Sequence, residues 1–131
     1  MTPANLDADL YTYRATCKRV VDGDTFDLVI DLGLGVHNVQ RVRLFGVDTP
    51  ETYGVKKDSE EYKAGMKAKM EVMRLLQMSV LPQPSFWVET HKDKTGKYGR
   101  YLATIWIKLE DEVVSLADHL IKEGLAEAMI Y

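Results

Sequence analysis

The chain has 131 residues, of which 46% are hydrophobic and 28% are charged, and its formal net charge is −3 at pH 7. This length fits one domain with its own hydrophobic core, and the composition is that of a globular protein without biased tracts or repeats. The weak negative charge argues against a protein that coats nucleic acid by bulk electrostatics, but not against an enzyme that uses a metal ion and a few local cations.

The N-terminal residues "MTPANLDADLYTYR" contain no basic segment followed by an apolar core, which an export signal requires. No apolar run in the chain is long enough to span a bilayer. Cys17 is the single cysteine, so an internal disulfide is impossible and a reducing compartment is the simplest home. We therefore expect a cytoplasmic monomer without membrane contact, folded as one domain over residues 1–131, with residues 1–9 as a flexible extension.

Three strands are expected before residue 50. The alternation in "YTYRATCK" predicts a half-buried strand whose inward face consists of Tyr11, Tyr13, Ala15 and Cys17. After the Asp-Gly turn in "VVDGDTFDLVI", a second strand has an apolar face made of Phe26, Leu28 and Ile30. "LGLG" supplies a loop, residues 36–47 read as a third strand, and Pro50 ends it because proline has no amide hydrogen to donate.

A long helix is expected next. Asp58 and Glu61 have the spacing of an N-terminal cap, and Pro82 and Pro84 mark the end. Apolar residues at spacings of three and four predict a buried stripe that consists of Tyr62, Met66, Met70, Met73 and Leu76. Gly65 lies inside this helix and should weaken it by roughly 1 kcal/mol relative to alanine.

The last third of the chain adds two strands and a second helix. "SFWVET" and "YLATIWIKL" predict the strands, and the apolar face of the second consists of Tyr101, Ala103, Ile105 and Ile107. Ser115 with Asp118 predicts the start of a short helix, and Gly124 predicts its end. This element order predicts a mainly β fold with helices (α+β): a five-stranded OB-fold barrel with one long helix between strands 3 and 4 and a short C-terminal helix.

The acids and histidines raise the question of a calcium site or a zinc site. Calcium prefers oxygen ligands, but "DGDTFDLVIDLG" is not an EF-hand loop, because its sixth residue is Asp27 instead of glycine and its twelfth is Gly33 instead of glutamate. Zinc is poorly supported because the three histidines are scattered and lack a cysteine partner. Asp22 and Asp24 alone could be ordinary turn residues, so their role depends on the rest of the site.

A second cluster, "RVRLFGVDTPE", places Arg43 on a strand whose end carries Asp48, with Glu51 beyond the proline. Carboxylates at strand ends can converge with Asp24 at the start of a neighbouring strand, so that two acids bind a hard cation and a third acts as general base. Arg43 would offer a bidentate donor to a phosphate. The alternative without a function is that "DTPE" is a strand-ending turn and that Arg43 forms a surface ion pair of little energetic value.

The third cluster is the basic connection "KDKTGKYGR", which by itself is most often a solvated turn. Together and in this order, "DGDT", "RLFGVDTPET" and "DKTGKYGR" resemble the staphylococcal nuclease (thermonuclease-like) family, over about residues 19–126, with "GLA" near the end as weaker support. The resemblance implies a calcium-dependent nuclease on an OB-fold, a hydrolase that cleaves phosphodiester bonds of DNA, with RNA as a second candidate substrate, by metal-assisted attack of water.

The resemblance also implies a role for each site residue. Asp24 and Asp48 would be carboxylate ligands of Ca²⁺, Thr49 a ligand through its backbone carbonyl, and Glu51 the residue that orients or deprotonates the attacking water. Two arginines would bind the scissile phosphate, namely Arg43 and Arg100. Four further residues would contact the nucleic acid, namely Lys97 and Tyr98 at a terminal phosphate and the loop lysines Lys56 and Lys57.

The alternative function is a non-catalytic OB-fold module, derived from a nuclease, that binds nucleic acid or peptide. Such a binder has no need for three acids around a phosphate site, where they repel the ligand unless a metal ion neutralises them. The sequence retains every residue of the implied catalytic set, namely Asp24, Arg43, Asp48, Glu51 and Arg100. We therefore favour the enzyme.

Overall fold

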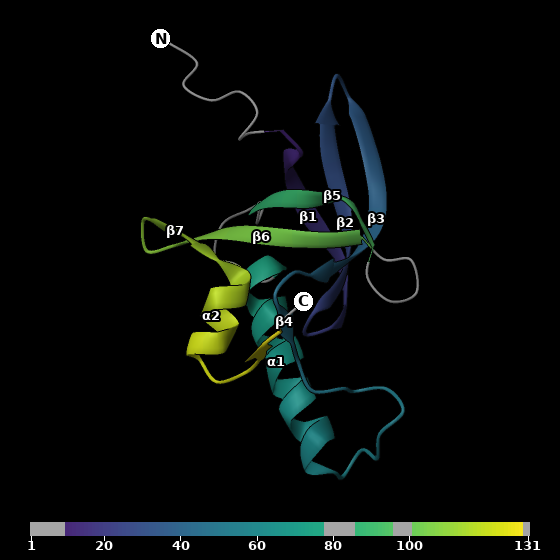
Figure 1. The fold of residues 1–131 in the computed structure, drawn as a ribbon, viewed down its shortest axis with the longest axis vertical. Coiled ribbons are helices and arrows are strands. Elements are labelled where there is room, and N and C mark those ends of the chain that lie inside the picture. Colours follow the sequence, from purple (N-terminus) through teal and green to yellow (C-terminus); the bar gives the residue numbers. More distant parts are fainter. Residues whose placement is uncertain (1–9, 78–85, 96–100, 130–131) are drawn as a thin grey trace.

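A computed structural model of the chain describes residues 10–77, 86–95 and 101–129, with residues 92–95 described by their backbone (Figure 1). The expected extension at residues 1–9 and the prolines expected to end the long helix lie outside this part. The elements are β1 (Thr12–Asp22), β2 (Thr25–Gly33), β3 (Val36–Leu44), β4 (Val47–Asp48), α1 (Glu60–Leu76), β5 (Phe86–Thr95), β6 (Tyr101–Leu109), β7 (Glu112–Ser115), α2 (Leu116–Lys122) and β8 (Glu127–Ala128).

The predicted barrel is confirmed. Strands β3, β2, β1, β5 and β6 pair in that order as antiparallel neighbours. A parallel pairing of β3 with β6, from Val42↔Tyr101 to Leu44↔Ala103, then closes the five strands into a barrel. The strand β7 extends β6 as a hairpin, and β4 pairs with β8 in a separate two-stranded sheet. In the described part of the chain, two helices complete the mixed α+β fold that the sequence predicts.

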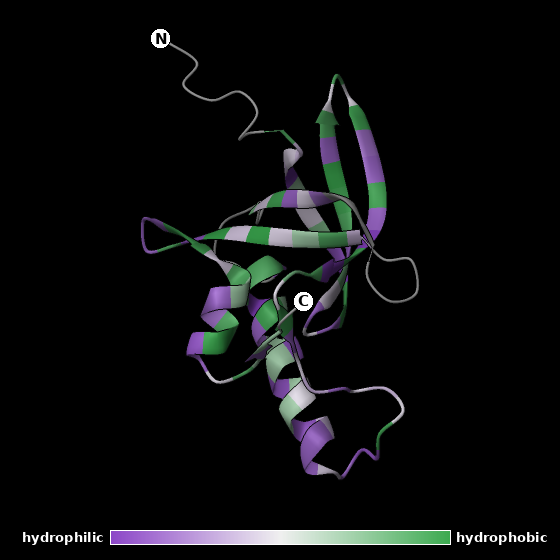
Figure 2. Ribbon diagram, in the orientation of Figure 1, coloured by the Kyte–Doolittle hydropathy of each residue, from purple (hydrophilic) through white to green (hydrophobic). Residues whose placement is uncertain are grey.

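The core follows the alternation seen in the sequence. Figure 2 shows polar and apolar residues alternating along the β2–β3 hairpin, and the inward set of β2, namely Phe26, Leu28 and Ile30, is buried. Both helices contribute to the same core, through Val72 and Leu76 of α1 and through Leu116 and Leu120 of α2. No helix in the described part of the chain has the length and apolar character needed to cross a bilayer.

The helix α1 differs from its prediction in two ways. Its N-cap is Ser59 instead of Asp58, because the Ser59 hydroxyl accepts the Tyr62 N–H. Its fully buried line is Gly65, Ala68, Val72 and Leu76, whereas Met70 is 53% exposed. The predicted methionine stripe is therefore wrong at Met70, since α1 presents its smallest residues to the neighbouring backbone and this rotates the methionine toward the surface.

The strand ends differ from expectation where the backbone turns. The third strand ends at Leu44 and not at residue 47, because Gly46 takes a φ of +89° and the chain resumes as β4. Tyr11 and Tyr101 are exposed, so neither belongs to the core faces assigned to them. The prediction for α2 is confirmed: the Ser115 hydroxyl accepts the N–H of Asp118, and Gly124 follows the helix with a φ of +72°.

An ion-paired group joins the two helices. Glu71 of α1 accepts two hydrogen bonds from Arg74, at 2.6 and 3.1 Å, and its Oε2 lies 2.9 Å from Nε2 of His119 in α2. The hydrogen bond from Arg74 and the one from His119 lower the pKa of Glu71 to about 2, although partial burial opposes this shift. This carboxylate is therefore a titratable link between α1 and α2.

Candidate active site

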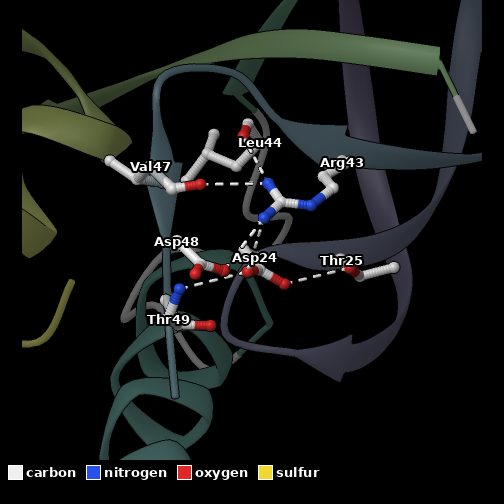
Figure 3. Close-up of polar contacts among 7 residues, drawn as sticks. All are labelled: Asp24, Thr25, Arg43, Leu44, Val47, Asp48 and Thr49. Carbon is white, nitrogen blue, oxygen red and sulfur yellow. Dashed lines mark hydrogen bonds and ion pairs between the residues drawn. The ribbon is translucent and has the colours of Figure 1, made fainter. Parts of the chain in front are cut away.

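The turn between β1 and β2 holds a buried aspartate. Asp22 ends β1 and pairs with Thr25 at the start of β2, so Gly23 and Asp24 form the turn. The Asp24 side chain is buried and accepts two hydrogen bonds, from the Thr25 hydroxyl to Oδ1 at 3.0 Å and from the Thr49 N–H to Oδ2 at 3.1 Å (Figure 3). The second bond ties the turn to the segment that follows β4.

One nitrogen of the Arg43 guanidinium contacts the carboxylates of both Asp24 and Asp48 (Figure 3). Its Nη2 is 3.0 Å from Asp48 Oδ1 and 3.4 Å from Asp24 Oδ2. Its Nη1 donates to the carbonyl oxygens of Leu44 and Val47, at 3.3 and 3.0 Å. The sheet register explains the position, since Arg43 pairs with Thr25 next to the turn and the chain reverses at Gly46 so that β4 returns its carbonyl to the guanidinium.

The acids of this site interact electrostatically. Burial raises the pKa of Asp48, and the neighbouring Asp24 carboxylate raises it further against the opposing effect of Arg43. Burial also raises the pKa of Glu51, with smaller contributions from Asp22, Asp24 and then Asp48. The structure therefore brings together the acids of two motifs that lie about 25 residues apart in the sequence.

The oxygen atoms at the site suit a hard divalent cation. Besides burial, four carboxylates, those of Asp22, Asp24, Asp48 and Glu61, raise the pKa of Glu51, and Arg43 is in direct contact with two of them. The hydroxyl of Thr49 is buried and has no hydrogen-bond partner in the described structure. Among the described residues, no three acidic, histidine or cysteine side chains already form a complete metal site. The fit therefore rests on an all-oxygen donor set with excess negative charge.

A cavity of about 390 Å³ opens beside these residues. Its walls are the segment from Asp48 to Glu51, Glu61 and Ala64 of α1, and the segment from Gly124 to Glu127 that contains the "GLA" motif. This volume lies in the range of small-ligand sites. Glu61 and Glu127 add two acids that the sequence did not indicate, because neither belongs to one of the three motifs.

Five predicted site residues remain, and the structure describes two of them. Lys56 and Lys57 are exposed in the loop before α1, where the Lys56 carbonyl accepts from Ser59 and neither lysine side chain contacts the site in the described structure. The other three, Lys97, Tyr98 and Arg100, lie outside the described residues, so their roles stay predictions. The sequence does not indicate the contact between Thr52 and Asp22, in which the Thr52 hydroxyl donates to Asp22 Oδ1 at 2.6 Å.

The sequence family can now be stated. Residues 41–131 match the family model described as "Staphylococcal nuclease homologue". The chain belongs to this family. The nuclease-family match begins two residues before Arg43, so Asp24 precedes the matched region. In the structure, Asp24 contacts two residues of the matched region, through the Arg43 side chain and the Thr49 N–H. The predicted family and fold are confirmed.

Three relatives are similar over most of the chain. A thermonuclease from Staphylococcus intermedius is 39% identical over 114 residues, which is 87% of this chain and 58% of the relative. A thermonuclease from Staphylococcus hyicus is 34% identical over 125 residues, 95% of this chain and 63% of the relative. An uncharacterized protein from Methanocaldococcus jannaschii is 28% identical over 132 residues, 90% of this chain and 60% of the relative. The chain therefore spans about three fifths of the length of these relatives.

Proposed function

We propose that this chain is a calcium-dependent nuclease that hydrolyses phosphodiester bonds in nucleic acid by attack of water. The observation that carries the proposal is the contact of Arg43 with both Asp24 and Asp48, in a chain of the staphylococcal nuclease family. A phosphodiester is an anion that resists anionic nucleophiles, so its hydrolysis needs positive charge beside a group that handles a proton. This site offers an arginine and acids that suit a cation within one cluster.

The proposed ligands of Ca²⁺ are the carboxylates of Asp24 and Asp48 and the backbone carbonyl of Thr49. Calcium accepts irregular sets of carboxylate and carbonyl oxygens, which is the donor chemistry of these residues. Bound calcium would supply a Lewis acid that polarises a phosphoryl oxygen. The buried position of Asp24 and its hydrogen bonds from Thr25 and Thr49 hold that carboxylate in place before any ligand binds.

The protein's own side chains would perform the remaining steps. Glu51 orients the attacking water or takes its proton, which is the usual task of a carboxylate beside a phosphate site. Arg43 binds the scissile phosphate and stabilises the charge that develops on its oxygens, because its planar guanidinium matches two phosphate oxygens. Arg100 is proposed for the same task on the resemblance alone.

The proposed substrate is a flexible strand of nucleic acid. The two relatives with the highest identities reported above are named thermonucleases, which supports nucleic acid as the substrate class. We assign Lys97 and Tyr98 to a terminal phosphate, and Lys56 and Lys57 to the backbone of the bound strand. A site that places one phosphate among an arginine and several acids favours backbone that can bend into it, so single strands should be cut faster than duplex.

A cleavage assay tests the proposal. Purified protein is incubated with end-labelled single-stranded DNA, duplex DNA and RNA, each in calcium and in chelator. The proposal predicts cleavage in calcium, fastest for the single-stranded substrates, and no cleavage in chelator. Retention of the strands without cleavage under every condition would instead support the non-catalytic binding module.

A further inference from the structure

The segment that carries Glu51 packs against the backbone of α1 at a glycine. A Cβ atom at Gly65 would lie 2.6 Å from the carbonyl oxygen of Pro50 and 2.9 Å from that of Glu51. Contacts this short do not occur for real Cβ atoms, and backbone carbonyls cannot move aside as the end of a flexible side chain can. Any larger residue at this position must therefore displace either the helix or the segment.

A second contact holds the same segment to β1. The Thr52 hydroxyl donates to Oδ1 of Asp22 at 2.6 Å, and Asp22 is only 7% exposed. Asp22 is the last residue of β1 and is followed by the turn that carries Asp24. The residue after Glu51 is thus bonded to the strand that presents one of the proposed metal ligands.

A third contact lies at the other end of the segment. The Thr49 N–H donates to Asp24, and a Cβ atom at Gly23 would lie 3.0 Å from the Thr49 side chain and 2.9 Å from the Cβ of Ala68. Ala68 is one helical turn after Gly65, so small residues at both positions let the segment and the β1–β2 turn approach α1 closely. Thr49 and Thr52, which precede and follow Glu51 in the chain, are therefore hydrogen-bonded to Asp24 and Asp22.

We propose that Gly65 and Asp22 are positioning residues for Glu51. Gly65 sets the depth at which the segment from Pro50 to Thr52 packs on α1, and Asp22 sets its position along β1 through Thr52. This inference rests on the proposed function, in which Glu51 acts on the attacking water. A displacement of about 1 Å in a catalytic group can cost on the order of 100-fold in rate, so both residues should affect turnover without contacting the substrate.

The first test is Gly65→Ala. Alanine favours the helix more than glycine does, so a glycine with no positioning role would leave turnover unchanged and the helix more stable. We expect kcat to fall by about tenfold or more, while KM and calcium affinity change by less than about twofold. The control is Met70→Ala, an exposed position on α1, which should keep the wild-type kcat. A wild-type kcat in Gly65→Ala would overturn the assignment of Gly65.

The second test uses Thr52, in case Gly65→Ala does not fold. Thr52→Val keeps the shape of the side chain and removes the donor to Asp22, whereas Thr52→Ser keeps the donor and removes the methyl group. We expect Thr52→Val to lose most of its kcat at nearly unchanged KM, and Thr52→Ser to recover most of that loss. Equal kcat values in the two variants would overturn the assignment of Asp22.

A measurement without substrate separates this inference from the proposed function. In metal-free protein, the backbone amide resonances of Glu51 and Thr52 should shift in Gly65→Ala and should stay in place in Met70→Ala. Unchanged resonances in Gly65→Ala would overturn the inference even in an active enzyme. Shifted resonances in a protein that cleaves no nucleic acid would support the packing of the segment and reject the nuclease assignment.

Discussion

Arg43 donates from Nη2 to Oδ1 of Asp48 at 3.0 Å, and the same nitrogen lies 3.4 Å from Oδ2 of Asp24. The arginine side chain is only 12% exposed, so its charge acts in an environment where water screens it weakly. The guanidinium thus neutralises part of the charge of Asp24 and Asp48, and its Nη1 donates to the backbone carbonyls of Leu44 and Val47. Three elements, the β1–β2 turn, the end of β3 and β4, meet at this one side chain.

The first prediction concerns Arg43→Lys. Lysine keeps the positive charge but cannot reach two phosphate oxygens with a planar group, nor two carbonyls and two carboxylates at once. We expect a loss of about 100-fold or more in kcat, with a smaller loss in affinity for a product-like nucleotide. Steady-state kinetics and equilibrium binding of the nucleotide measure the two effects. Near-wild-type turnover would remove Arg43 from the mechanism.

The second prediction concerns Asp24→Asn in metal-free protein. Charge repulsion between Asp24 and Asp48 alone would make this variant more stable, but Asp24 also accepts from Thr25 and Thr49 and pairs with Arg43. The loss of charge on a buried acceptor should outweigh the relief of repulsion, so we expect the free energy of unfolding to fall by about 1–3 kcal/mol. Calcium-dependent hydrolysis should be abolished.

Chemical unfolding in chelator and a cleavage assay in calcium measure these two effects. The matched control is Asp58→Asn, an exposed position outside the site, which should change neither stability nor activity. A stable and fully active Asp24→Asn protein would show that Asp24 is only a turn residue.

The third prediction concerns the link between the helices. The pKa of Glu71 is lowered from 4.5 to about 2, chiefly by the hydrogen bond from Arg74. Its contribution to stability is therefore complete above pH 4.5 and is lost as the pH falls from 4.5 toward 2, because protonation then becomes a cost of the folded state. Glu71→Gln should be less stable than wild type by about 1–3 kcal/mol near pH 6 and close to wild type near pH 2.

Urea unfolding at a series of pH values measures this difference. Glu60→Gln serves as the control, because the Glu60 side chain is almost fully exposed and its ion pair with Lys63 spans 3.7 Å. A gap between wild type and Glu71→Gln that stays constant down to pH 2 would contradict the assigned link.

The fourth prediction is that magnesium replaces calcium poorly. Magnesium requires a nearly ideal octahedron of short bonds, whereas the proposed site combines two carboxylates from different elements with a backbone carbonyl. Cleavage rates in each metal, after exhaustive removal of the other, give the comparison. Equal rates in the two metals would contradict the proposed ligand set.

Much of the barrel follows from the sequence because burial on one side of a strand imposes a period of two. The inward residues of β2 and the caps of α2 are local patterns that act over a few residues, so they could be predicted. The buried face of α1 could not be predicted. Met70 has the spacing of a core residue, but the backbone packs closely against Gly65 instead, and the Met70 side chain is exposed. A local pattern does not contain the distance between α1 and a distant segment.

The candidate site could likewise be predicted only in part. The three motifs and their order indicated which acids and which arginine would meet, and the structure brings Asp24, Arg43 and Asp48 together. The hydrogen bond from Thr52 to Asp22 could not be predicted, because it joins residues 30 positions apart and Asp22 reads as a turn residue in the sequence. The short strands β4 and β8 are likewise set by tertiary contact, since two residues carry no periodicity.

We propose that acids from two motifs act with Arg43 in metal-assisted hydrolysis. This is tested by the rate at which purified wild-type protein and Glu51→Gln cleave a labelled single-stranded DNA, in calcium and in excess chelator. We predict cleavage by the wild type in calcium alone, and a loss of about 100-fold or more in Glu51→Gln. Cleavage that persists in chelator, or equal rates for the two proteins in calcium, would contradict metal-assisted hydrolysis with Glu51.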